Sequence, residues 1–181
     1  MLHITVPARE FYDESSEQFV QIEEQTLVME HSLISISKWE AKWKKPYLSD
    51  EQKTREETLD YLRCMTVKPA KVDPLVYMSL SKQNLEDISN YIQDPMTATT
   101  ITDKNPKRSR EILTSEVIYY YMIAQNIPVE FEKWHLSRLI TLIRVCAIKN
   151  DPHPKKMSKA AIARQNRALN AARRAKYNTK G

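Results

Sequence analysis

The sequence predicts a mostly helical α+β protein with a small N-terminal β element, a helical body and a basic C-terminal helix. Near the N-terminus apolar residues alternate with polar ones, which is typical of strands. Farther along they recur at three- and four-residue steps in segments that prolines separate, which is typical of amphipathic helices. The last part is rich in alanine and in cations. We therefore divide the chain into residues 1–31, 32–150 and 151–181.

The expected β element consists of three short apolar runs. Residues 2–6 alternate between apolar and polar side chains. Residues 19–22 and 26–29 are two further runs, and they flank the polar segment 23–25. This arrangement predicts a β-hairpin with a loop of about three residues.

The helical body is expected to begin at Ser32. Apolar residues keep helical spacing from there to Pro46, which ends the first helix. Thr54 and Glu57 then fit a capping box, in which the Thr54 hydroxyl accepts from the Glu57 amide while the Glu57 side chain reaches back. Further helix starts are expected at the capping residues Asp73, Ser81, and Thr114 or Ser115.

A poor helix former and a proline shape the second half of the body. Residues 96–110 are β-branched and then polar, which favours a loop or an edge strand. Pro128 opens the longest apolar helix, expected over residues 129–148. A proline-rich hinge, residues 151–154, ends the body. One face of the long helix is expected to hold Phe131, Trp134, Leu139, Leu142, Ile143 and Cys146.

The net charge of +5 conceals a strong asymmetry. Residues 1–153 hold 19 basic and 23 acidic residues, a net charge of −4, and the remainder holds no acidic residue. A helix is expected there from Ser158 to about Lys176, with only Ile162 and Leu169 as large apolar residues, too few to anchor it to a core. The basic arm carries Lys155, Lys156, Lys159, Arg164, Arg167, Arg173, Arg174, Lys176 and Lys180.

Glycine is nearly missing, because the chain contains only Gly181. Glycine lets a backbone adopt positive φ and approach a ligand closely. A Gly-rich phosphate loop, a dinucleotide fingerprint and a nucleophile elbow are therefore excluded. No apolar run reaches the roughly 18 residues of a membrane span, and no signal peptide is recognisable, so a soluble intracellular protein is expected.

Metal binding and catalysis have little support in the sequence. None of the four histidines has another histidine or a cysteine at a metal-ligand spacing. Carboxylates are plentiful, but no familiar catalytic spacing appears among them. Cys64 and Cys146 fall in apolar helical patterns and are expected to be reduced core residues. We therefore expect no metal, no cofactor and no enzymatic activity.

Aromatic residues cluster in two places. Trp39 and Trp43 are four residues apart and so share one helical face, with lysines around them. This face is either core packing or a protein-binding patch, since tryptophan and tyrosine are enriched at binding hot spots. The residues Tyr119, Tyr120 and Tyr121 are consecutive, so they cannot all face inward on one helix, and at least one must be exposed or at an interface.

The basic arm has three open interpretations. It is a solvated terminus, a nucleic-acid-binding helix with a steep salt dependence, or a segment that folds on an acidic protein surface, including the body itself. Membrane binding is disfavoured, because the apolar face of the arm lacks tryptophan and phenylalanine.

Several stretches resemble one family of small proteins from long-tailed bacteriophages, the tail assembly chaperones. The likeness covers most of residues 30–181. The stretches that carry it are SLISISKWE at 32–40, DPMTATT at 94–100, EKWHL at 132–136, KKMS at 155–158, NAARR at 170–174 and NTKG at 178–181.

The resemblance implies a non-enzymatic assembly protein in the cytoplasm of the infected bacterium. Its partners would be the tape-measure protein, whose exposed apolar helical faces need cover, and the tail tube protein, whose subunits later displace the chaperone. Self-association is a further alternative. The helix-in-groove mode of binding suits this task. The arm would engage acidic stretches of the partner or of neighbouring copies. The expected groove residues are Trp39, Trp43, Tyr119, Tyr120, Tyr121 and Trp134.

Two alternatives stay open. One is a nucleic-acid-binding phage protein that uses the basic arm, and the other is a structural component of the virion.

Overall fold

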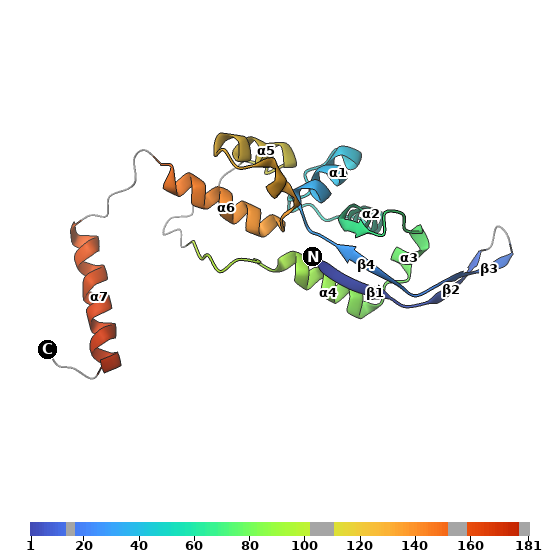
Figure 1. Ribbon diagram of the computed structural model, residues 1–181, viewed down its shortest axis with the longest axis horizontal. Helices are drawn as coiled ribbons and strands as arrows, with labels where there is room; N and C mark the ends of the chain where they lie inside the picture. Colours follow the sequence, from blue (N-terminus) through green and yellow to red (C-terminus); the bar gives the residue numbers. More distant parts are fainter. Residues whose placement is uncertain (14–16, 102–110, 152–158, 178–181) are drawn as a thin grey trace. The chain divides into compact units, whose positions relative to one another are not determined.

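The computed structural model has the predicted fold class, an α+β fold that is mostly helical (Figure 1). Its described residues contain seven α-helices, one short 3-10 helix and five strands. The chain divides into two compact units, Met1–Ala147 and Ile148–Gly181. The residues that the structure describes are 1–13, 17–101, 111–151 and 159–177.

Four of the strands build one antiparallel ribbon. β1 (Leu2–Val6) pairs with β4 (Gln25–Met29), and β2 (Arg9–Asp13) pairs with β3 (Gln18–Ile22). β5 (Thr66–Lys68) adds to the other side of β4, so the strand order of the main sheet is β1-β4-β5. In Figure 1 the pair β2–β3 prolongs the pair β1–β4 in one direction.

The predicted hairpin around residues 23–25 is wrong. Val6 lies opposite Gln25, and Arg9 lies opposite Ile22, so the two pairings share one continuous register. β3 and β4 therefore follow each other along one side of the ribbon instead of pairing. The apolar runs do form strands, but which strands pair depends on burial and register across the whole sheet.

The first two helices begin as predicted. Ser32 caps α1 (Leu33–Trp43), where its hydroxyl accepts from a backbone N–H of the first turn. The capping box opens α2 (Arg55–Met65), since Thr54 Oγ1 accepts from the Glu57 N–H at 3.2 Å and Glu57 Oε2 accepts from the Thr54 N–H at 2.7 Å. Local capping chemistry therefore fixes both helix starts.

The next helix starts also follow the predicted caps. Asp73 caps α3 (Pro74–Met78), and Ser81 caps α4 (Lys82–Gln93). In each case a side-chain oxygen accepts from a backbone N–H of the first turn, which satisfies a donor that the helix itself leaves free.

Thr114 caps α5 (Ser115–Ala124), as predicted. Between α4 and α5 the sequence favoured a loop or an edge strand over residues 96–110. Residues 96–101 have no regular structure, and 102–110 lie outside the described residues.

The long helix predicted over residues 129–148 is wrong, because it is two elements. A 3-10 helix, η1 (Val129–Lys133), precedes α6 (Leu136–Lys149). Trp134 between them has an extended backbone with ψ of 160°. The N–H of the first α6 residue donates to the His31 carbonyl at 2.8 Å, so a tertiary hydrogen bond replaces a helical one. Phe131 and Trp134 therefore do not continue the apolar face of α6.

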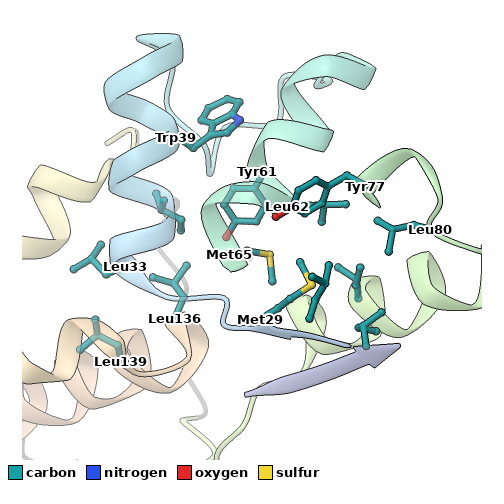
Figure 2. Close-up of a cluster of buried hydrophobic side chains, with 14 of the residues drawn as sticks. Met29, Leu33, Trp39, Tyr61, Leu62, Met65, Tyr77, Leu80, Leu136 and Leu139 are labelled. Carbon is teal, nitrogen blue, oxygen red and sulfur yellow. The ribbon is translucent and has the colours of Figure 1, made fainter. Parts of the chain in front are cut away.

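The hydrophobic core lies between the sheet and the helices of the first unit (Figure 2). Side chains of β4, α1, α2 and α6 meet there, and α3 and α5 contribute as well. Fully buried examples are Leu27, Met29, Leu33, Ile36, Met65, Ile118 and Leu139. The parts that the sequence separates at residue 31 thus share one core.

A polar cluster is buried where β4 leads into α1. The Tyr91 hydroxyl donates to Glu30 Oε1 at 2.6 Å. His31 Nδ1 forms a short hydrogen bond with the Tyr61 hydroxyl. His135 Nε2 lies 3.0 Å from the Tyr91 carbonyl oxygen. The cluster joins α4 and α2 to the segment that precedes α6.

Among the residues that the structure describes, four other than glycine have positive φ, namely Glu17, Lys44, Met96 and Asn126. Lys44 follows the last residue of α1, with φ of 56° and ψ of 33°, a position where helices commonly place glycine. Its N–H donates to the Glu40 carbonyl at 2.8 Å, which closes the helix end.

The second unit contains α7 (Lys159–Tyr177). It holds six cations and no acidic residue, and its side chains are exposed wherever the structure describes them.

Candidate functional site

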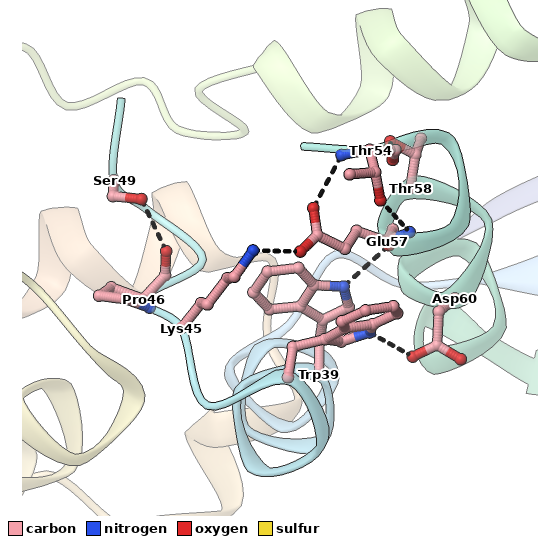
Figure 3. Close-up of polar contacts among 9 residues, drawn as sticks. Trp39, Lys45, Pro46, Ser49, Thr54, Glu57, Thr58 and Asp60 are labelled. Atoms are coloured by element: carbon pink, nitrogen blue, oxygen red, sulfur yellow. Dashed lines mark hydrogen bonds and ion pairs between the residues drawn. The ribbon is translucent and has the colours of Figure 1, made fainter. Parts of the chain in front are cut away.

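The two predicted groove tryptophans form the contact between α1 and α2. Trp39 is only 1% exposed, and its indole N–H donates to the Glu57 backbone carbonyl at 2.8 Å. Trp43 is half-buried, and its indole N–H donates to Asp60 Oδ2 at 2.9 Å. Figure 3 shows Trp39 beside both α2 residues. The expectation that this pair lines a groove is corrected, because α2 covers Trp39 and holds Trp43.

Two of the lysines near the tryptophans, Lys42 and Lys45, also belong to this contact. Lys45 Nζ lies 2.7 Å from Glu57 Oε1, and Lys42 Nζ lies 2.5 Å from Asp60 Oδ1. Both carboxylates are buried. The hydrogen bond from Lys45 is the main reason that the pKa of Glu57 is below its usual value, and the Thr54 amide adds to it. Lys42 and Lys45 thus neutralise two carboxylates of α2, so they do not form a cationic rim for an acidic partner.

The hollow beside Trp39 is too small to be a binding groove. The hollow beside Trp39 has a volume of about 10 Å³, which is room for about one water molecule. A larger cavity of about 370 Å³ lies between α1 and the β5 region, and the sequence did not predict it. Burial raises the pKa of the Cys64 thiol in its wall, so this thiol is protonated at neutral pH. Other lining residues include Ile34, Lys38, Val67 and Lys133.

The three consecutive tyrosines of α5 have three different environments. The Tyr119 hydroxyl donates to Glu132 Oε2 at 2.7 Å, which ties α5 to η1. The Tyr121 hydroxyl donates to Glu111 Oε2 at 2.5 Å. Tyr120 between them is 65% exposed, which confirms that one tyrosine of the three must lie at the surface.

The body holds α5 firmly by its opposite face. Ile118 and Met122 of that face are buried in the core. The Glu40 carboxylate of α1 accepts from the Ser115 N–H at 2.8 Å, at the first residue of α5. A carboxylate at a helix N-terminus also complements the helix dipole. The orientation of α5 is thus set by a packed face and by a buried hydrogen bond.

The outward face of α5 is the candidate functional site. Tyr120 and Ile123 are three residues apart and so are neighbours on this face. Their side chains are 65% and 75% exposed. An ordinary surface helix has polar residues on its outer face, so α5 is unusual in being apolar on both sides. We call Tyr120 and Ile123 the outer α5 face.

Trp134 lies at the junction of η1 and α6 and not on α1. Its ring stacks on Phe131, with centroids 4.2 Å apart, and Arg138 Cζ lies 4.0 Å from the ring centroid. The ring is half-buried between these two side chains. Trp134 therefore stabilises the junction, and the expected groove residues do not form a single surface.

The basic arm is described only in part. Lys155 and Lys156 lie outside the described residues. Lys159 is the first residue of α7. The exposed cations of α7 are Arg164, Arg167, Arg173, Arg174 and Lys176.

Two searches of the described residues bear on other kinds of site. No three histidine, cysteine, aspartate or glutamate side chains among them are placed to hold a metal ion. No helix among them has the length and apolar character that crossing a membrane requires.

Comparisons with known proteins gave no match. No protein-family model matches the chain. No curated protein and no solved structure matches it either.

Sequence reasoning missed Ile123 as a site residue, although a signal for it was present. Residues 117–124 are apolar or aromatic without a break, so a helix over them is apolar all round and cannot bury every side. The exposed aromatic pair of the β2–β3 ribbon, Tyr12 and Phe19, was also missed, because the strand pairing was wrong.

Proposed function

We propose that the chain is a non-enzymatic assembly protein of tailed bacteriophages, a tail assembly chaperone that acts in the cytoplasm of the infected bacterium. It binds apolar helical segments of the tape-measure protein and releases them to tail tube subunits. The sequence likeness described above motivates the proposal, and the outer α5 face is the observation that carries it.

The chemistry of the outer α5 face suits an apolar helical partner. Tyr120 and Ile123 present an aromatic ring and a branched aliphatic chain on a rigidly held helix. An amphipathic helix that lays its own apolar residues on this face removes both side chains from water, a gain of roughly 25 cal/mol for each Å² of apolar surface buried. Tyrosine adds a hydroxyl that stays at the wet rim of such a contact.

The buried carboxylates of the body support a non-enzymatic role. Glu40 accepts from two backbone N–H groups, those of Tyr47 at 2.7 Å and Ser115 at 2.8 Å. Glu57 and Asp60 pair with Lys45 and Lys42, and they also accept from the Thr54 N–H and the Trp43 indole N–H. A general acid or base needs a proton-transfer position free for a substrate, whereas these carboxylates are committed to holding the fold.

Coexpression with a tape-measure protein of a long-tailed bacteriophage tests the proposal. The wild-type chain is expected to raise the soluble fraction of the tape-measure protein, and the variant Tyr120→Glu/Ile123→Glu is expected to lose that effect. The matched control Met78→Glu/Leu85→Glu, at two apolar residues of α3 and α4 that are also exposed, should keep it. Equal soluble fractions with the wild-type and the α5 variant would show that the outer α5 face is not the binding surface.

Mass spectrometry of purified particles separates the chaperone from a structural component of the virion. An assembly chaperone leaves before the tail is complete, so we expect the chain in infected cells but not in finished particles. Stoichiometric amounts in the particles would reject the chaperone function.

A further inference from the structure

The distal β2–β3 ribbon is strongly acidic. Residues 9–25 contain six carboxylates and a single cation, Arg9, for a net charge of −5. Among the described residues of this stretch, Glu10, Glu17, Glu23 and Glu24 are exposed, and no ion pair joins them to a described cation. The ribbon therefore concentrates a charge excess that the rest of the described body does not neutralise.

An aromatic pair lies on the same ribbon. Tyr12 and Phe19 are directly opposite each other in the register, with ring centroids 5.1 Å apart. They are 54% and 68% exposed. Glu10 lies two residues before Tyr12 on β2, so its side chain is on the same face of the ribbon. This face thus combines apolar rings with a carboxylate, and an apolar cation-bearing partner would complement it.

α7 has the opposite charge and a matching arrangement. Ile162 and Leu169 are seven residues apart and so lie on one side of the helix, where both are exposed. Arg173 and Lys176 follow Leu169 at four and seven residues and border the same side. The stretch from Ile162 to Lys176 is about 21 Å long, and a five-residue strand is about 17 Å long, so the two surfaces have similar lengths.

We propose that α7 of one copy docks on the acidic β2–β3 ribbon of a second copy. Charge complementarity between two segments of the same sequence identifies the occupant. Arginine and lysine of α7 meet the ribbon carboxylates, and Ile162 and Leu169 cover Tyr12 and Phe19. If each copy gives its helix to the other, both ribbons are covered in one closed, two-fold dimer. This inference does not depend on the proposed chaperone function.

A self-interaction explains more of the molecule than nucleic-acid binding does. A phosphate backbone would account for the cations of α7, but it would leave the acidic ribbon unexplained and would be repelled by it. The docking of α7 on the ribbon uses both charge excesses and both exposed apolar pairs.

Charge reversal in the full-length chain tests the docking. The ribbon variant is Glu10→Lys/Glu17→Lys/Glu23→Lys, and the helix variant is Arg173→Glu/Lys176→Glu, at the two cations that border the apolar side of α7. Sedimentation velocity is expected to show a wild-type dimer at about 50 mM salt that dissociates at about 500 mM, because screening weakens exposed ion pairs. Each variant alone should associate at least about tenfold more weakly, since like charges then face each other.

Two restorations make the test specific. An equimolar mixture of the ribbon variant and the helix variant should form a heterodimer, because each then offers the other a complementary surface. A chain that carries all five reversals should dimerise again. The control variant Asp50→Lys/Glu51→Lys/Glu56→Lys, at exposed acidic residues of the body, should dimerise like the wild type, and circular dichroism checks that every variant is folded.

Several results would overturn the proposal. One is a wild-type chain that is monomeric at low salt, which would also be the result if α7 docked on the ribbon of its own chain. Another is a dimer that persists in the ribbon variant or in the helix variant. A mixture that stays monomeric would do the same. Duplex DNA is the further probe, and tight binding that only the helix variant loses, without any self-association, would assign α7 to nucleic acid instead.

Discussion

The imidazole rings of His31 and His135 meet edge to face inside the body, with ring centroids 5.1 Å apart. Both side chains are buried. His135 Nδ1 has no hydrogen-bond partner in the described structure. Burial, and secondarily the charge of a protonated His135, lower the pKa of His31 from its ordinary 6.5 to about 4. The native body therefore requires a neutral His31.

Stability is expected to fall with acidification. His31 takes up a proton near pH 6.5 when the chain is unfolded and near pH 4 when it is folded, so its contribution is full above pH 6.5 and is lost as the pH falls towards 4. The shift corresponds to roughly 3 kcal/mol of unfolding free energy. Urea unfolding at pH 7.5 and at stepwise lower pH measures it. The variant His31→Asn should have a flatter pH profile, and an unchanged profile would contradict this origin.

Replacing Trp39 by phenylalanine is expected to destabilise the body by about 2 kcal/mol, because the change removes packed volume and the hydrogen bond to the Glu57 carbonyl. Trp43→Phe should cost less, since Trp43 is only half-buried and Asp60 keeps its contact with Lys42. Chemical denaturation of both variants makes the comparison. Equal losses would show that burial of Trp39 does not set its contribution.

Glu40→Gln is expected to cost about 2 kcal/mol of unfolding free energy. Each carboxylate oxygen accepts from a different backbone N–H, whereas glutamine offers one acceptor and places an NH₂ group against the other donor. Hydrogen exchange should quicken most at Ser115 and the first turn of α5. Glu116→Gln, at an exposed residue of the same turn, is the control. If hydrogen exchange in α5 quickened in Glu116→Gln but not in Glu40→Gln, the link between α1 and α5 would be rejected.

Thr54→Ala is expected to destabilise the protein by about 1 kcal/mol, because it removes the acceptor for the Glu57 N–H. Thr54→Ser keeps the hydroxyl and should recover most of the loss. Thermal unfolding followed by circular dichroism compares the three proteins. A serine variant as unstable as the alanine variant would mean that the methyl group, not the cap, matters.

Helix starts were predictable from sequence because capping is local. Ser32, Thr54, Asp73 and Ser81 each satisfy a backbone donor two or three residues away, and that relation can be seen in the letters alone. The break at Trp134 could not be seen, because it depends on a hydrogen bond from α6 to the carbonyl of a residue about a hundred positions earlier. The prediction of strand pairing failed for the same reason, because pairing depends on contacts between residues far apart in the sequence.

The candidate site was predictable only in part. Three consecutive tyrosines guarantee an exposed one, and Tyr120 is that residue. Spacing placed Trp39 and Trp43 correctly on one helical face, but periodicity does not tell whether solvent or another helix covers that face. α2 covers it here, through contacts that involve residues 57 and 60.

The positive φ angles of Lys44, Met96 and Asn126 have a consequence for stability. Left-handed geometry costs roughly 1 kcal/mol or more for a residue with a Cβ atom, and glycine avoids that cost. Replacing one of these residues by glycine could therefore relieve local strain in a chain whose single glycine is Gly181. Each of these bends is thus a position where one substitution can raise thermal stability, and the added margin would tolerate surface substitutions that cost less than it gains.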